Sequence, residues 1–373
     1  RITRRAGVPR RLSMLGVRDV ASRPGRAALT ALAIAVAVVG LVVSSGFVGG
    51  IASARADTAR VGDPYDVTVV TTGMSPAQLE GILESDPDVD AWYSEIWRRS
   101  TFHDGAFSSI AIGGDPADAR FRIAAGRNME RAGEAIAGYG FMKRFGVSVG
   151  DQITFLAGTT PLTVRIVGWY RETEDTGEVL QYRLATLTAK EPGVTSDVYR
   201  VTAAPGISPA ALASEIQPRV GSGATLEAMD TSNDTLDTFT AAMRLVAAIL
   251  ILMAGTNLLT SLLTTTRESA RRVGVQEAIG FTPRQLIGQG AMAGATLGLA
   301  AVVVGVPLGL LLFGALSDLV GKGIGVGPGW VAMPSGAQLA VVAVLALVVS
   351  AGLGALAVAR LARRPAAELV RWE

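Results

Sequence analysis

Long apolar runs alternate with polar stretches along this chain. A helix needs about 20 mostly apolar residues to cross the hydrocarbon of a membrane. Four runs satisfy this, at 27–51, 239–263, 286–316 and 339–359, and they predict four transmembrane helices. Arginines before the first run and the sequence Ala-Ser-Ala at 52–54 would also fit a signal peptide. The apolar region of a signal peptide has only about 7–15 residues, so we favour a retained helix.

The long segment 52–238, between the first two runs, has a different pattern. Short β-rich or alternating runs, bounded by Gly, Pro and Asp, predict strands. They read YDVTVV, SSIAIGG, DQITFLA, LTVRIVGWY, QYRLATLTA and DVYRVTA. Ser75-Pro76 and Ser208-Pro209 predict helix starts, because serine is a good N-cap and proline suits the first helical position. The segment therefore predicts an α+β domain.

An internal repeat organises this domain. Asp-Val at 66–67 followed by Ser-Pro-Ala-x-Leu at 75–79 parallels Asp-Val at 197–198 followed by Ser-Pro-Ala-x-Leu at 208–212. Each copy predicts a strand, a turn and a helix, and two copies can form one split sheet with helices on a face. Residues from about 100 to 191 would then be an insertion that forms a small β-rich subdomain.

Charge is sorted along the chain and sets the predicted orientation. The stretch 52–237 carries 26 acidic and 16 basic residues, whereas the remainder carries 6 acidic and 18 basic ones. Arginine and lysine are retained on the cytoplasmic side of membrane proteins. The segment 1–26, which includes an expected interfacial helix, the loop 264–285 and the tail 360–373 are rich in arginine and are predicted to be cytoplasmic. Residues 52–238 and the loop 317–338 are predicted to lie outside, with the protein in the cell membrane.

Small residues recur four apart within the apolar runs. Such spacing lets helix backbones approach closely in a membrane, where apolar burial gives no drive for association. We expect a helix-packing role for Gly46, Gly50, Gly290, Gly294 and Gly298.

The sequence offers little for catalysis. It has no cysteine, and its single histidine, His103, has no partner histidine. A G-x-x-x-x-G-K-[ST] motif is absent, so the chain is not expected to hold ATP in a P-loop. The acidic run 172–178 lacks the alternating ligands of a calcium loop and is interpreted as a solvated turn. We expect no enzyme activity, cofactor, metal or nucleic acid.

The loop after the second run reads TTTRESARRVGVQEAIGFTPRQLIGQG. It resembles the FtsX-like permease family, which includes the MacB-type exporters and carries R-E-I-G-V-L-K-A-L-G-A-T-P-R-Q at this place. The sequence departs from that pattern at Arg272, Gln276 and Glu277. Residues 146–151 and 164–168 resemble the family's k-x-G-v-x-v-G-d and v-v-G signature, and 364–368 resembles its D-P-x-E-A ending. The resemblance covers nearly the whole chain.

The resemblance implies a type VII ABC permease: four membrane helices and an extracytoplasmic porter-type domain with an inserted subdomain. It also implies a partner ABC ATPase that binds the ATP, and a lipid membrane. A second permease copy, or a second half of a longer chain, is expected as well, because an ATPase dimer needs two coupling helices. The residues expected to couple to the ATPase are Arg271, Arg272, Val273, Gly274, Val275, Glu277, Ala278, Gly280, Thr282, Pro283 and Arg284.

Two functions from different classes follow. The first is export or extraction of a substrate, driven by ATP hydrolysis in the partner and transmitted to the extracytoplasmic domain. The alternative is signalling, in which that domain activates a cell-wall hydrolase or another outer partner. The signalling members usually have a smaller domain, so the large two-part domain favours export.

The predicted orientation can be tested by labelling, because the chain has no native cysteine. Single cysteines in place of Ser75 and Ser208 are expected to react with an impermeant thiol reagent in intact cells. A cysteine in place of Ser269 is expected to react only after the cells are opened. Labelling of that position from outside would reverse the assigned orientation.

Overall fold

The computed structural model describes residues 24–229, 234–268 and 280–361, which form two compact units. The helical unit comprises residues up to Gly50, Thr235–Ala315 and residues from Ala332 onward. The α/β unit comprises Ile51–Asp234 and Leu316–Val331. The predictions for 1–23, 230–233, 269–279 and 362–373 concern residues outside these described ranges.

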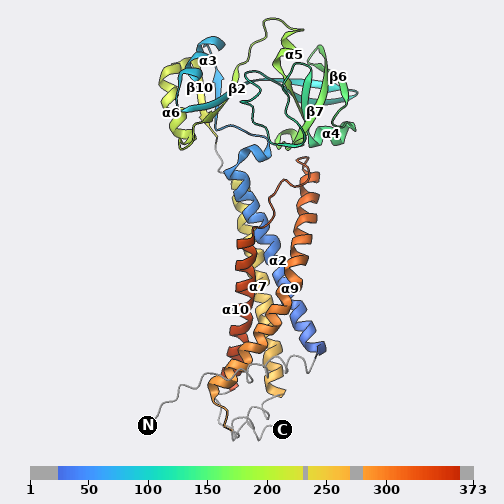
Figure 1. Ribbon diagram of the computed structural model, residues 1–373, viewed down its shortest axis with the longest axis vertical. Coiled ribbons are helices and arrows are strands. Elements are labelled where there is room, and N and C mark those ends of the chain that lie inside the picture. The colour runs from blue at the N-terminus through green and yellow to red at the C-terminus, as the bar shows by residue number, and fades with distance from the viewer. Residues whose placement is uncertain (1–23, 230–233, 269–279, 362–373) are drawn as a thin grey trace. The chain divides into compact units, whose positions relative to one another are not determined.

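Four long helices build the helical unit (Figure 1): α2 (Pro24–Ala56), α7 (Asp234–Glu268), α9 (Pro283–Gly323) and α10 (Gly336–Leu361). Within the described part of the chain, these four are the helices long and apolar enough to span a membrane. The prediction of four transmembrane helices is confirmed. The observed α9 is longer than its predicted run, which ended before Asp318 and Lys322. Charged residues end a membrane span but not a helix, whose backbone hydrogen bonds also form in water.

The predicted packing glycines lie at close contacts between these helices. A Cβ atom on Gly294 would overlap the Ser350 carbonyl oxygen of α10, and one on Gly298 would lie 2.9 Å from the Ser350 Cβ. Gly290 faces Gly354 in the same way. A Cβ on Gly46 of α2 would lie 2.6 Å from the Phe313 ring, and Gly50 is buried. These distances support the packing role, which stays a prediction.

The first lobe of the α/β unit, here the split βαβ lobe, holds both copies of the repeat. Its strands pair antiparallel in the order β10–β1–β9–β2. Its elements are β1 (Val67–Thr71), α3 (Pro76–Ser85), β2 (Val89–Phe102), β9 (Val198–Ala203), α6 (Pro209–Val220) and β10 (Ala224–Ala228). Ser75 and Ser208 are the N-caps of α3 and α6, as expected. One core is shared by the two copies, with Leu79 and Leu83 of α3 packed with Leu212 and Ile216 of α6.

The second lobe, here the barrel lobe, is the inserted β-rich subdomain. Strand pairing runs β2–β3–β8–β5–β7–β6 and back to β2, which closes a circuit, and β4 adds to β7. Its own elements are β3 (Gly105–Ile112), β4 (Ile123–Gly126), β5 (Glu134–Gly138), α4 (Tyr139–Phe145), β6 (Gln152–Ala157), β7 (Thr160–Tyr170), η2 (Glu174–Gly177), β8 (Val179–Arg183) and α5 (Leu184–Thr188). Phe107, Phe141 and Phe155 fill its core. The predicted fold class, four membrane helices with an α+β domain that carries a β-rich insertion, is confirmed.

The glycine contact between α9 and α10 is testable with a matched pair. Gly294→Ala is expected to lower the unfolding free energy by about 1–3 kcal/mol, because the methyl group forces the two backbones apart. Gly352→Ala on α10 is the control, since nothing lies within 4 Å of the added atom. Thermal unfolding in detergent micelles measures both. Equal stability of the two variants would remove Gly294 from the packing.

Candidate functional site

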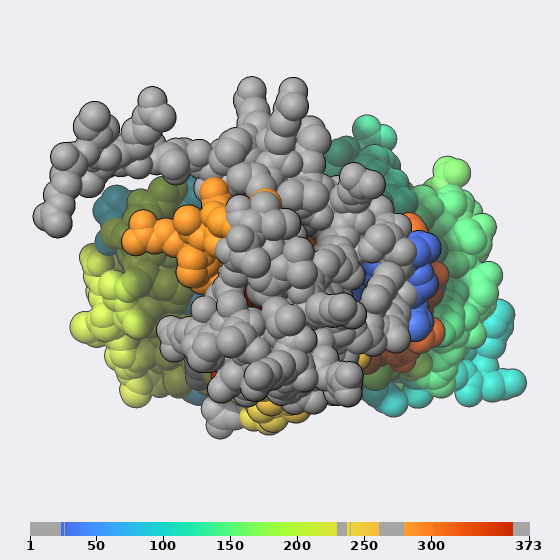
Figure 2. Space-filling model, turned by 90° about the horizontal axis from the view of Figure 1, so that it is seen from below, coloured from blue at the N-terminus to red at the C-terminus, as the bar shows by residue number. Residues whose placement is uncertain are grey.

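The predicted coupling residues divide between described and undescribed parts of the chain. Most of them lie outside the described residues: Arg271, Arg272, Val273, Gly274, Val275, Glu277 and Ala278. Gly280, Thr282, Pro283 and Arg284 are described, and all four are exposed. The start of α9 that they form reaches the surface seen in Figure 2, where it is orange.

A tight turn and a helix cap give this exposed end a fixed geometry. Gly280 has φ +100°, a left-handed conformation that side chains rarely adopt. Thr282 precedes α9, and its backbone N–H donates to the Gln285 side-chain oxygen at 2.9 Å. Pro283 occupies the first helical position, where its missing N–H costs nothing. The chain therefore enters α9 through a defined corner.

A second group of side chains lies where the two lobes of the α/β unit meet the segment that follows α2. Arg200 of β9 pairs with Glu95 of β2 at 2.9 Å, and both side chains are largely buried. The guanidinium also lies 4.2 Å from the centre of the Tyr65 ring and donates to the Thr68 hydroxyl at 2.6 Å. These contacts form the centre of what we call the junction.

Burial raises the pKa of two further carboxyl groups of the junction. Burial, then the nearby Glu174 carboxylate, raises the pKa of Asp63 to about 7, although Arg200 opposes the shift. Burial likewise raises the pKa of Glu172 to about 8, although hydrogen bonds to the carboxylate favour its charged form. The Tyr170 hydroxyl donates to Glu172 at 2.8 Å, and so do the backbone N–H groups of Thr173 and Glu174.

The junction joins three parts of the α/β unit through polar contacts. Asp63 and Tyr65 come from the short connection between α2 and β1, Glu95 and Arg200 from the shared sheet, and Glu172 from the end of β7. One signal in the sequence could have found it: Glu95 is a charged residue in the middle of a strand, between Ser94 and Ile96, which are both buried. Its partners are distant in sequence and could not be inferred.

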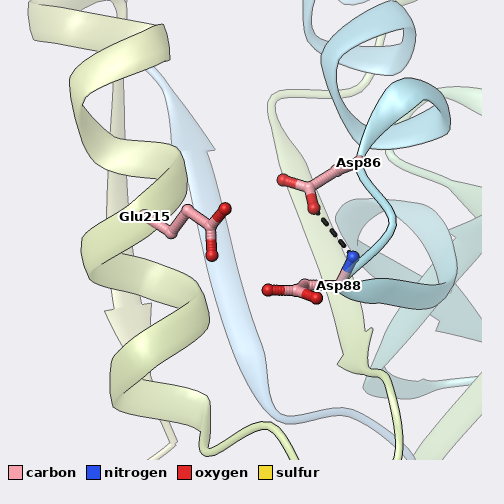
Figure 3. A group of neighbouring side chains, drawn as sticks. All are labelled: Asp86, Asp88 and Glu215. Atoms are coloured by element: carbon pink, nitrogen blue, oxygen red, sulfur yellow. Dashed lines mark hydrogen bonds between the residues drawn. The ribbon is translucent and has the colours of Figure 1, made fainter.

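Three other carboxylates meet at the edge of the split βαβ lobe (Figure 3). Glu215 of α6 faces Asp86 and Asp88, which follow α3, and their oxygens lie within 4.8 Å of one another. The buried Asp86 is paired with Arg219 and accepts the Asp88 backbone N–H at 2.9 Å. A hydrogen bond with Asp88 raises the pKa of Glu215. Arg219 supplies the positive charge here, so the cluster carries no metal assignment.

Two family models together cover most of the chain. Residues 27–219 match the MacB-like periplasmic core domain, and 244–366 match the FtsX-like permease C-terminal domain. The chain belongs to the MacB/FtsX family of ABC transporter permeases. It is accordingly a multi-pass membrane protein of a generally non-catalytic family, and that family membership implies an ATPase partner. The resemblance carried by the loop 264–285 and the signature residues is confirmed.

Similar solved structures are distant. The periplasmic region of MacB from Actinobacillus actinomycetemcomitans has 12% identity and a TM-score of 0.33, over 48% of this chain and 92% of that one. The extracellular domain of the noncanonic ABC-type transporter YknZ from Gram-positive bacteria has 12% identity and a TM-score of 0.34, over 44% and 99%. A comparison with curated proteins gave no match.

The protonated carboxyls of the junction predict a pH-dependent stability. Glu172 binds its proton in the folded state up to about pH 8, whereas in the unfolded chain it releases it near 4.5. The folded state therefore holds the extra proton between these values, and stability falls as pH rises through them. The slope is at most about 1.4 kcal/mol per pH unit for one proton.

Glu172→Gln is expected to remove this contribution, so that the variant gains stability over the native chain at pH 8 but not at pH 4.5. Thermal unfolding of the full chain, followed by tryptophan fluorescence, measures it at the two pH values. Glu227→Gln, at an exposed position of β10, is the control. A pH-independent difference between Glu172→Gln and the native chain would refute the assignment.

Proposed function

We propose that this permease couples ATP hydrolysis by a separate ABC ATPase to motion of its α/β unit, for export or extraction of a substrate. The carrying observation is that α2 runs unbroken from Pro24 to Ala56 and its last turn belongs to the α/β unit. An α-helix transmits a displacement along its length because each turn is fixed by backbone hydrogen bonds. Only a short segment then separates α2 from the junction at Asp63 and Tyr65.

The start of α9 is the proposed contact with the ATPase. Gly280, Thr282, Pro283 and Arg284 are exposed, and the corner that they form is held by the Gln285 side chain. A force on this corner acts directly on α9, which begins at Pro283. The neighbouring residues Arg271 to Ala278 are proposed to complete the contact. The proposal places this end and both chain termini in the cytoplasm and the α/β unit outside the cell membrane.

Two coupling elements are proposed per working unit, one for each face of an ATPase dimer. The second one comes from another copy of this chain or from a second half of a longer chain. The partner holds the ATP, since the sequence has no P-loop motif.

Reconstitution tests the proposed function. The permease is purified with the ATPase that its own membrane supplies, and molecules that co-purify are identified by mass spectrometry. We expect a bound substrate that leaves when ATP is added. The substrate is expected to stay bound when the P-loop lysine of the ATPase is replaced, so that the ATPase no longer hydrolyses ATP. A complex that holds no substrate but activates a cell-wall hydrolase in an ATP-dependent way would replace export by signalling.

The corner at Gly280 provides a matched test of coupling. Gly280→Ala adds one methyl group in open space, but the φ of +100° makes any side chain strained there. Gly288→Ala, on α9, also adds a methyl group in open space without this strain. We expect Gly280→Ala to reduce stimulated ATP hydrolysis while membrane insertion is unchanged, and Gly288→Ala to be neutral. Equal hydrolysis in both would exclude the corner from coupling.

A further inference from the structure

The connection between α9 and α10 is part of the α/β unit. Leu316–Val331, here called the clasp segment, includes the last two turns of α9 and the turn that follows. Val326 is 1% exposed and Val331 is 5% exposed, which is unusual for a short glycine-rich connection. The segment is therefore held against other residues of this unit.

Hydrogen bonds within the clasp segment give it a fixed shape. The Gly327 N–H donates to the Gly321 carbonyl at 2.9 Å, and the Gly329 N–H donates to the Asp318 carboxylate at 3.0 Å. The Trp330 ring N–H donates to the Ser317 carbonyl at 3.0 Å. Each bond joins the turn back to the end of α9, so the turn and the helix end form one piece.

The clasp segment touches the barrel lobe through backbone. A Cβ atom on Gly325 would overlap the Thr176 carbonyl, and one on Gly177 would overlap the Gly325 carbonyl. Gly325 and Gly177 both have positive φ, so conformation and space each require glycine. Thr176 and Asp175 of η2 also have positive φ, which non-glycine residues adopt only when the surroundings impose it. The contact is thus tightly specified on both sides.

Arg171, which follows β7, adds a polar contact through two nitrogen atoms. Its Nε and Nη2 atoms both donate to the Pro328 carbonyl, at 3.1 and 3.0 Å. The guanidinium lies 5.7 Å from the Trp169 ring, and Trp169 packs on Tyr139. A Cβ on Gly327 would lie 2.8 Å from the Tyr139 ring. Arg171 and Tyr139 of the barrel lobe therefore contact the turn, and Trp169 packs beside both of them.

The four helices connect to the two lobes in different ways. The segment after α2 leads into β1, and β10 leads toward α7, so the chain joins both helices to the split βαβ lobe. The segment after α2 also contacts the barrel lobe, through an ion pair of Asp57 with Arg122 at 2.9 Å and through the Thr173 hydroxyl, which donates to the Val61 carbonyl at 3.4 Å. The α9 and α10 helices flank the clasp segment, whose contacts are with η2, β7 and α4 of the barrel lobe. Each lobe has its own apolar core.

We infer that the clasp segment is a fixed second attachment, which carries the displacement of α9 and α10 to the barrel lobe. In this inference α7 acts on the split βαβ lobe, and the segment after α2 contacts both lobes. Movement of α9 and α10 relative to α7 then becomes a relative movement of the two lobes about the junction and the shared strand β2. This inference rests on the proposed function, because it assigns the route by which the same displacement reaches the α/β unit.

Chemical bridging tests the attachment. The Lys143 ammonium of α4 donates to the Lys322 carbonyl at 3.4 Å, and both side chains are exposed. Cysteines in place of Lys143 and Lys322 are expected to be joined within one chain by a short bis-maleimide in native membranes. The control pair has cysteines in place of Lys190, which follows α5, and Lys322. This pair is expected not to be joined. Failure of the first pair to bridge would overturn the attachment.

Arg171 variants test the role of the attachment in coupling. Arg171→Ala is expected to speed hydrogen exchange at the Gly327 and Gly329 amides about tenfold or more, the effect of losing a charged hydrogen bond. It is also expected to lower ATP-driven substrate release. Arg171→Lys keeps the positive charge but not the planar pair of donors. Its exchange rates and its substrate release are expected to lie between those of the native chain and those of Arg171→Ala. Bridging Lys143→Cys to Lys322→Cys in the Arg171→Ala chain is expected to restore substrate release. A chain that had lost release through general misfolding would not be restored by this bridge.

Unchanged exchange and release in Arg171→Ala, or no restoration by the bridge, would overturn the inference. A chain that is bridged between positions 143 and 322 and keeps Arg171 is expected to release substrate fully. Loss of release in this bridged chain would show that the contact has to open during the cycle, which would contradict a fixed attachment. Failure of the proposed function is recognised separately. In that case the unmodified chain shows no ATP-driven release, while bridging and exchange still report the state of the clasp segment.

Discussion

The hydrocarbon of a membrane forces every backbone polar group of a spanning segment into an internal hydrogen bond. The membrane part of this permease is therefore built from uninterrupted helices, and α2 and α9 extend beyond their apolar runs without a break. Such helices can shift and tilt, and a displacement of one end reaches the other, although Pro307 removes one internal hydrogen bond of α9. What matters for the α/β unit is thus where each helix end is attached, and how firmly.

Glycine contacts recur wherever this permease needs backbones to approach without help from apolar burial. Gly290 and Gly294 let α9 lie against α10, where the surrounding lipid is as apolar as the side chains. Gly177 and Gly325, both buried, let η2 and the clasp segment touch outside the apolar runs. The two contacts share a geometry although their surroundings differ, because in both a methyl group would fill the space that the neighbouring carbonyl occupies.

Local patterns in the sequence predict the elements, and distant pairings decide how they are joined. The apolar runs, the Ser-Pro helix starts and the repeated Asp-Val strands predict the four helices and the split βαβ lobe, because each signal lies within about one element. The closed circuit of the barrel lobe depends on β6 returning to β2, and nothing local encodes it. The junction and the clasp segment were missed for the same reason: Arg200 meets Glu95, and Arg171 meets Pro328, across long sequence distances. The glycine run at 321–329 was visible but gave no indication of its partner.

The junction differs from both lobe cores in the kind of interaction that holds it. Each core is apolar and close-packed, and such cores resist deformation. The junction instead gathers Asp63 and Glu95 around Arg200, with Glu172 close to Asp63, and burial raises the pKa of Asp63 to about 7 and that of Glu172 to about 8. Hydrogen bonds and ion pairs can exchange partners over small displacements, whereas an interdigitated core cannot. The two lobes share β2 and this polar centre, and the clasp segment attaches α9 and α10 to one of them. Such an arrangement suits the proposed conversion of helix movement into lobe movement.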